Sequence, residues 1–191
     1  RIKDEVWIGA TPEVFLKRKN NKYMTYALAG TRFLTSNKPF SEKERDEQTI
    51  VKNYILDLLK NYQCSSISVS ETEEFNTGNL IHLVNEIKFE TLNSESIIER
   101  LHPTPAVCGF PLQASLDFIT KYENLDRAFY SGYLGPVYRG NEFSLWVNLR
   151  CAKIANNTIR FYAGAGITED SIAKSECLET ERKMDTLRQF I

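Results

Sequence analysis

Two glycines and an acidic segment close to the C-terminus constrain the fold of this chain more than any other stretch. Gly164 and Gly166 close a strand-like run, and a helix-like segment follows after a short turn. Glycine lets the backbone approach another group closely, and its N–H group can meet an anion. On the helix, Glu176, Glu179 and Lys183 are spaced three and four residues apart, so their side chains project from one face.

This helix face has two interpretations. In the simpler one it is a solvated surface, on which Glu179 and Lys183 form the ion pair that is common at this spacing. In the other, the two carboxylates share a hard cation such as Mg²⁺, and the lysine meets a second negative group. Spacing alone favours the solvated surface.

Composition limits the classes of protein that the chain can belong to. Its 191 residues, 42% hydrophobic and 26% charged, suit one soluble domain with a sizeable core. A formal net charge of -1 argues against a general nucleic-acid-binding surface, and no apolar run approaches a membrane span. The four cysteines are scattered, which favours reduced thiols in a cytoplasmic protein over a disulfide framework or a zinc site.

Apolar periodicity predicts an α+β fold of layered antiparallel sheets with outer helices. Strands are expected at residues 6–10, 14–16, 23–34, 65–70 and 80–89, and further strands at 129–138, 142–154 and 158–163. Apolar residues alternate strictly in 143–150, so Arg150 is expected on the face that Ser144, Trp146 and Asn148 share. The residues 71–79 are expected to form a polar loop.

Helices are expected at residues 42–59, 94–101 and 112–122. Ser41 and Glu44 form a capping box for the first of these. Glu47 falls on its apolar stripe, where a carboxylate either extends out to solvent or has a partner inside. The third helix is expected to bury Phe118. Between the last two, three prolines in residues 101–111 predict a rigid, extended loop.

Several segments, in order along the chain, resemble the signatures of the chorismate-binding enzymes. They read T-P-E-V-F-L (11–16), L-A-G-T-R (28–32), K-E-R-D-E-Q (43–48), D-R-A-F-Y-S-G (126–132), L-R-C-A (149–152) and G-A-G-I followed by E-x-x-E-T-x-x-K (164–183). This family includes isochorismate, salicylate, anthranilate and aminodeoxychorismate synthases, and the resemblance implies the anthranilate synthase component I-like fold. The segment L-H-P-T-P-A-V with G-x-P (101–111) is most similar to isochorismate synthases.

The resemblance implies a role for each matching residue. Glu13 matches the general acid, and the family's Mg²⁺ would be held by Glu47, Glu176 and Glu179. Gln48 stands where the family usually has a histidine, which leaves the Glu47 carboxylate in place. The residues implied to bind substrate are Gly30, Thr31, His82, Tyr130, Leu149, Arg150, Gly164, Gly166 and Lys183.

The implied activity is that of an isomerase that converts chorismate to isochorismate, by adding water at C2 with loss of the C4 hydroxyl. The family's general base is a lysine in a K-V-V-L-x-R-like strand upstream of the glutamate segment, and this sequence contains no such strand. We therefore expect residues 1–191 to be the C-terminal portion of one catalytic domain, inactive without the upstream half of its own polypeptide. At full length we expect a cytoplasmic monomer with chorismate as its small-molecule substrate and no nucleic-acid or membrane partner.

Two alternatives stay open at this point. A salicylate synthase would form isochorismate and then eliminate pyruvate in the same pocket. A non-catalytic chorismate-binding module would keep the fold without the reaction, although a retired site has no physical need for so many like charges. The sequence does not separate menaquinone from siderophore biosynthesis as the use of the product.

Overall fold

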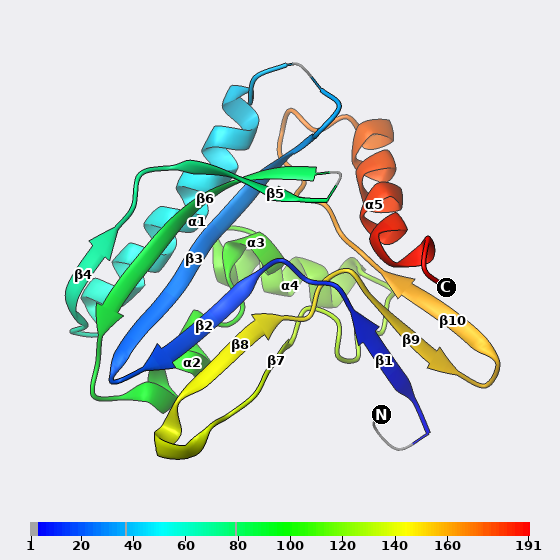
Figure 1. The fold of residues 1–191 in the computed structure, drawn as a ribbon. Helices are drawn as coiled ribbons and strands as arrows, with labels where there is room; N and C mark the ends of the chain where they lie inside the picture. The colour runs from blue at the N-terminus through cyan, green and yellow to red at the C-terminus, as the bar shows by residue number, and fades with distance from the viewer. Residues whose placement is uncertain (1–3, 37, 79) are drawn as a thin grey trace.

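A computed structural model describes residues 4–36, 38–78 and 80–191, and in these residues the strands form two antiparallel sheets (Figure 1). The larger sheet has the order β4-β6-β3-β2-β8-β7, and β5 also pairs with β6. The smaller sheet has the order β1-β9-β10. The larger sheet contains β2 (Val14–Lys19), β3 (Lys22–Phe33), β4 (Ser65–Val69), β5 (Glu73–Thr77), β6 (Leu80–Glu90), β7 (Tyr133–Leu134) and β8 (Phe143–Val147). The smaller one contains β1 (Val6–Gly9), β9 (Cys151–Ala155) and β10 (Thr158–Tyr162). The predicted α+β class with antiparallel sheets and outer helices is confirmed.

Helices cover one face of the larger sheet, and one helix stands apart. In Figure 1, α1 crosses behind β3 and β6, and α5 lies beyond the ends of β3 and β5. The helices are α1 (Glu42–Asn61), α2 (Ser94–Leu101), α3 (Pro105–Cys108), α4 (Leu112–Tyr122) and α5 (Ala173–Arg188). No helix in the described ranges is long and apolar enough to cross a membrane.

The main core lies between α1 and the larger sheet. Val51, Ile55 and Leu59 recur at helical spacing on α1 and are buried against the sheet together with Tyr23 and Ile87. Gln48 is buried on the same stripe and donates a hydrogen bond to Asn85 on β6. Burying an amide requires such a partner, and this pair fixes the helix to the sheet at one register.

A bulge in β3 sets the distance between this strand and the first turn of α1. The register of β3 on β6 shifts between Ala29 and Thr31, and Gly30 between them has φ +68°. A Cβ at Gly30 would lie 2.5 Å from the backbone oxygen of Glu44. The glycine therefore allows β3 and α1 to approach each other at the end of the sheet where Glu47 lies.

The chain passes from one sheet to the other at Arg150, where the sequence predicted a continuous strand. Strand β8 ends at Val147, and β9 begins at Cys151 in the smaller sheet. Arg150 has φ 46°, a left-handed conformation that breaks the strand alternation. The expectation that Arg150 shares a face with Trp146 is therefore wrong: Arg150 is buried, whereas Trp146 is half-buried.

Three local predictions are corrected. Residues expected to form a polar loop contain β5, which adds a strand to β6. The proline segment includes the short helix α3, which is possible because Pro105 takes its first position, where no N–H partner is needed. Helix α4 forms as predicted but has no buried residue, and Phe118 is 63% exposed.

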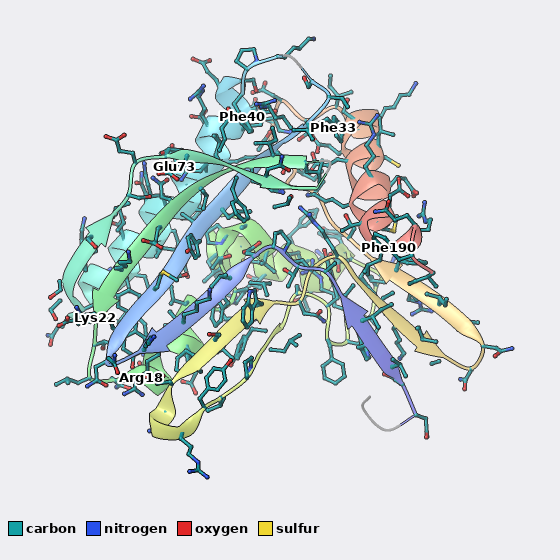
Figure 2. All side chains as sticks on the ribbon, in the orientation of Figure 1. Arg18, Lys22, Phe33, Phe40, Glu73 and Phe190 are labelled. Carbon is teal, nitrogen blue, oxygen red and sulfur yellow. The ribbon has the colours of Figure 1, made fainter. Side chains whose placement is uncertain are left out.

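Helix α5 returns the C-terminal end of the chain to β3 and β10. The guanidinium carbon of Arg182 lies 3.9 Å from the ring centroid of Phe33, at the end of β3. Figure 2 places Phe33 near the beginning of α5 and Phe190 near its end, while Lys22 marks the opposite end of β3. This packing brings the acidic face of α5 close to the end of β3 and the first turn of α1.

Candidate active site

Glu13 is buried at the start of β2, in a charge environment made by the far end of the chain. Glu13 is 7% exposed, and its backbone oxygen accepts a hydrogen bond from the N–H of Val147 at 3.0 Å. Burial raises the pKa of Glu13 to about 7, against the opposing effect of the positive charges of Lys183 and Arg150. A carboxyl group with this pKa holds a proton through much of the neutral range and can deliver it to a leaving oxygen.

Arg150 is held rigidly beside Glu13 by neighbours from β5 and β6. Its Nη2 lies 2.7 Å from Nε2 of His82, and its Nη1 donates to Oγ1 of Thr77 at 3.3 Å. Arg150 is 5% exposed, so its charge is poorly solvated, and the charges of Glu13 and Glu179 oppose the lowering of its pKa by burial. A guanidinium held in this way presents a fixed fork that suits a carboxylate.

His82 is neutral, and its hydrogen bonds determine its tautomer. Burial, followed by the charges of Arg150 and Lys183, lowers the pKa of His82 to about 3. Since a guanidinium only donates, Nε2 must accept from Arg150, and Nδ1 carries the proton. Nδ1 lies 3.1 Å from Oγ1 of Thr31, which can accept a hydrogen bond from the Nδ1–H group. Thr31 and His82 therefore support Arg150.

Lys183, the other cation that acts on Glu13, contacts the backbone of Gly164. The Lys183 Nζ donates to the backbone oxygen of Gly164 at 2.8 Å and forms an ion pair with Glu179 at 2.6 Å. A Cβ at Gly164 would lie 2.7 Å from the hydroxyl of Tyr130. The glycine thus makes room for Tyr130, whose ring stacks on Tyr162 of β10 with centroids 5.6 Å apart.

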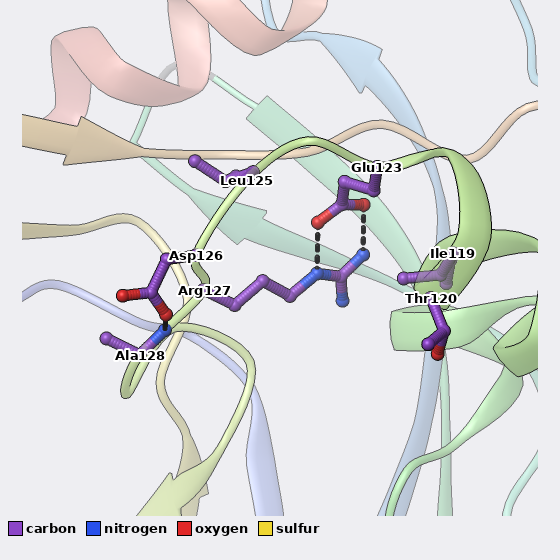
Figure 3. A pocket seen from close by; sticks show the side chains of 7 residues that line it. All are labelled: Ile119, Thr120, Glu123, Leu125, Asp126, Arg127 and Ala128. Carbon is purple, nitrogen blue, oxygen red and sulfur yellow. Dashed lines mark hydrogen bonds and ion pairs between the residues drawn. The ribbon is translucent and has the colours of Figure 1, made fainter.

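The loop that carries Tyr130 is anchored by a two-point ion pair. Arg127 Nε and Nη2 donate to the two carboxylate oxygens of Glu123 at 2.5 and 2.6 Å (Figure 3). The pair lies in a pocket of about 350 Å³ that contains none of the predicted site residues. A groove of about 500 Å³ between α1 and Phe110 contains none of them either. The Arg127 pair is therefore a support for the Tyr130 loop.

Lys43 lies among Glu47, Glu176 and Glu179, the carboxylates that the family resemblance implies as Mg²⁺ ligands. Lys43 Nζ is 2.5 Å from Glu176 Oε1 and 3.7 Å from Glu47 Oε1. Burial raises the pKa of Glu47, the charge of Lys43 lowers it, and the negative charges of Glu179 and Glu176 raise it again. The two helices thus bring acidic side chains into electrostatic contact with one another.

The chemistry of these donors fits a hard divalent cation, because all three are carboxylates. A Cβ at Gly166 would lie 3.6 Å from Glu47 Oε1, so the glycine turn also borders the cluster. Among the described residues, no three acidic, histidine or cysteine side chains are arranged so that they could hold a metal ion as they stand. A cation bound by this cluster would therefore require the side chains, and Lys43 among them, to move.

Two of the predicted substrate-binding residues contact structural elements in place of the charged side chains. Leu149 packs against the main hydrophobic core, and Gly30 faces the backbone of α1. Sequence reasoning missed Lys43 and Thr77. The four-residue spacing from Lys43 to Glu47 was a usable signal for an ion pair, whereas Thr77 was hidden in a segment interpreted as a loop.

Comparisons with known proteins place this arrangement in a family. The sequence model of the family described as "Chorismate binding enzyme" matches residues 1–191. The chain is 29% identical to the vibriobactin-specific isochorismate synthase of Vibrio cholerae, over 94% of this chain and 49% of that protein. It is 30% identical to the isochorismate synthase EntC of Escherichia coli, over 95% of this chain and 50% of that protein.

A solved structure agrees with these sequence relatives. MenF, the menaquinone-specific isochorismate synthase of Escherichia coli, superimposes with a TM-score of 0.85 at 28% identity, over 97% of this chain and 46% of MenF. The chain spans about half the length of the relatives that it matches. With the family model matching throughout and the fold shared, this chain belongs to the chorismate binding enzyme family.

Proposed function

We propose that this chain forms the acid-bearing and carboxylate-binding part of a Mg²⁺-dependent isochorismate synthase, an isomerase acting on chorismate. The observation that carries the proposal is the buried Glu13, whose pKa of about 7 reflects burial opposed by Lys183 and Arg150. An acid beside two cations suits a substrate that is anionic and must lose a hydroxyl group. The relatives named as isochorismate synthases support this choice of product.

Substrate binding follows from the charges around Glu13. Chorismate carries two carboxylates, and each needs cations or backbone N–H donors. Arg150 offers a fork held by His82 and Thr77. Lys183 and the backbone at Gly164 and Gly166 would meet the second carboxylate.

The acid step uses the proton of Glu13. Water forms a bond to C2 of the ring, the double bond shifts, and the bond from C4 to its hydroxyl oxygen breaks. Glu13 gives its proton to this departing oxygen, which leaves as water. A second group must take a proton from the attacking water, and we propose that a lysine from a segment beyond these 191 residues supplies that base. The upstream half of the polypeptide is thus the proposed partner of this chain.

The metal site is assigned to the carboxylate cluster. Glu47, Glu176 and Glu179 would hold Mg²⁺, which when bound would neutralise a carboxylate of the substrate. The convergence of acidic side chains from α1 and α5, together with their hard oxygen donors, supports this assignment. The names of the relatives include both a vibriobactin-specific and a menaquinone-specific enzyme, so both uses of the product stay open.

Product analysis of the complete enzyme tests the proposal. Purified full-length protein is incubated with chorismate and Mg²⁺, and the products are separated by chromatography against authentic standards. Accumulation of isochorismate is the expected result. Accumulation of salicylate would instead support pyruvate elimination in the same pocket. Chorismate binding without turnover by the complete enzyme would identify a non-catalytic module and overturn the proposal.

A further inference from the structure

Lys43 occupies a position that the proposed reaction does not use. It lies in the first turn of α1, and its ammonium joins that helix to α5 through Glu176. The same Nζ lies 3.7 Å from Glu47 on its own helix. Burial lowers the pKa of Lys43, but its hydrogen bond to Glu176 and the charges of Glu47, Glu176 and Glu179 outweigh this effect and raise it. One cation thus serves three carboxylates.

Without a cation, this cluster would be costly to assemble. Glu176 is 7% exposed, and an unpaired carboxylate at that burial loses its hydration without compensation. Like charges on neighbouring carboxylates also repel one another. An ammonium between them removes much of that repulsion and allows α5 to pack against α1.

A lysine suits this role because it can leave. Its charge is carried on a flexible stem of four carbons, and its side chain here is 22% exposed, so a path to solvent is open. A divalent cation entering between the carboxylates would compete with the ammonium for the same oxygens. The two cations would repel each other at contact distance from the same carboxylate oxygens, so binding of one disfavours binding of the other.

We propose that Lys43 is the internal counter-ion of the metal-free carboxylate cluster, and that Mg²⁺ binds by displacing its ammonium from Glu176 and Glu47. This inference rests on the metal site assigned under the proposed function. Lys43 is a positioning residue in this scheme. It keeps the cluster assembled in the metal-free protein and weakens the affinity for Mg²⁺ through competition.

The test is a titration of the protein with Mg²⁺ alone, by calorimetry. The variant Lys43→Met removes the competing charge, and we expect it to bind Mg²⁺ at least tenfold more tightly than the wild type. Lys43→Arg keeps a cation and should not gain affinity. Lys60→Met is the matched control, because Lys60 lies on the same helix in an exposed pair with Asp57, and its affinity should stay within twofold of the wild type.

Thermal unfolding in EDTA provides a readout that does not depend on activity. Lys43→Met should melt at a lower temperature than the wild type in EDTA, and Mg²⁺ should raise its melting temperature more than it raises that of the wild type. Equal or weaker Mg²⁺ binding by Lys43→Met would overturn the proposal, because a competitor was removed without effect.

A measurement on the wild type covers the case in which Lys43→Met does not fold. The ¹⁵N signal of the Lys43 ammonium, assigned by its loss in Lys43→Arg, should move toward the position of exposed lysines when Mg²⁺ is added. A signal that stays unchanged while Mg²⁺ binds would overturn the displacement but leave the metal site intact. If neither the wild type nor any variant binds Mg²⁺, even with chorismate present, the assigned metal site itself fails, and the displacement fails with it.

Discussion

At Glu13, burial and two nearby cations act on the pKa in opposite directions, and burial prevails. The motif around this residue makes it the candidate acid by resemblance, but its sequence neighbours gave no sign of its burial. Judged from its neighbours in the sequence alone, a glutamate beside a proline is most simply a surface carboxylate at the entry of a strand. The two cations that oppose the effect of burial, Lys183 and Arg150, lie far along the chain and approach Glu13 only through α5 and the sheet crossover.

Replacing Glu13 with Gln should change the pH dependence of the protein's stability. The folded-state pKa of about 7 lies above the ordinary value of 4.5 for a glutamate, so the folded protein binds the proton more tightly than the unfolded chain. The stabilisation that the proton on Glu13 provides is therefore fully present below pH 4.5, and it is lost as the pH rises through about 7. Between pH 4 and pH 8 the free energy of unfolding of Glu13→Gln should therefore rise by about 2–3 kcal/mol relative to that of the wild type, because each unit of pKa shift is worth about 1.36 kcal/mol.

Urea denaturation of both proteins at the two pH values measures this difference. Glu99→Gln, at an exposed position on α2, is the control for replacing a glutamate with glutamine. A Glu13→Gln advantage of the same size at pH 4 and pH 8 would show that the carboxyl group is not buried as described.

The contact between Gly164 and Tyr130 can be tested by rescue. Gly164→Ala places a Cβ 2.7 Å from the Tyr130 hydroxyl and should displace that ring, at a cost of about 1–3 kcal/mol. Tyr130→Phe removes the hydroxyl, and the next nearest Tyr130 atom lies 4.0 Å from the Cβ. The double variant should therefore recover most of the loss in thermal unfolding. Additive losses would show that the two residues do not meet.

Elements with strong periodicity or a clear cap lie where the sequence predicts them. Elements that depend on pairing with a distant segment were not predicted. Helix α1 begins after its capping-box residue Ser41, as predicted, and β3 and β6 lie where the sequence predicts strands, at 23–34 and 80–89. Strand β5 was missed because its polar residues form a strand only by pairing with β6. The split at Arg150 was missed because alternation through 143–150 carries no sign of a left-handed residue.

The bulge at Gly30 gives a test at the scale of elements. Gly30→Ala combines an unfavourable φ of +68° with a Cβ 2.5 Å from the α1 backbone. Gly140→Ala is a matched control, because Gly140 has φ +78° with nothing within 4 Å of the added Cβ. The strained backbone conformation should lower the free energy of unfolding of both variants by about 1 kcal/mol, and the clash should lower that of Gly30→Ala by about 1–3 kcal/mol more.

Chemical denaturation of the two variants gives this comparison directly. Because α1 carries Lys43 and Glu47, Gly30→Ala should also weaken Mg²⁺ binding, whereas Gly140→Ala should leave it unchanged. Equal losses of stability in both variants would mean that β3 and α1 do not approach as closely as described.

For the whole molecule, the charges of the candidate site come from both ends of the chain, while its apolar surface is incompletely covered. Phe118 on α4 and Val137 near β7 are 63% and 71% exposed. The apolar stripe of α4 predicted burial, but a stripe does not specify which segment buries it. The chain spans about half the length of its relatives, so a stripe can have its partner outside these residues.

The 191-residue chain alone should bind chorismate without converting it. Arg150, Lys183 and Glu13 are present, whereas the proposed general base is not. Single-turnover assays with excess chain should show less than about 1% of the rate of the complete enzyme, since general acid–base groups contribute about 10²–10⁴-fold each. Isochorismate formation by the 191 residues alone at a comparable rate would place the base within them.

The pH dependence of kcat/KM for the complete enzyme tests the central assignment most directly, because this parameter reports the pKa values of the free enzyme. With Glu13 as the acid at a pKa of about 7, kcat/KM for isochorismate formation should fall about tenfold per pH unit above neutrality. In Glu13→Gln the residual activity should be at least about 100-fold lower and should lack this decline. A kcat/KM that stays level from pH 6 to pH 9, or a Glu13→Gln variant with the wild-type profile, would contradict the role of Glu13.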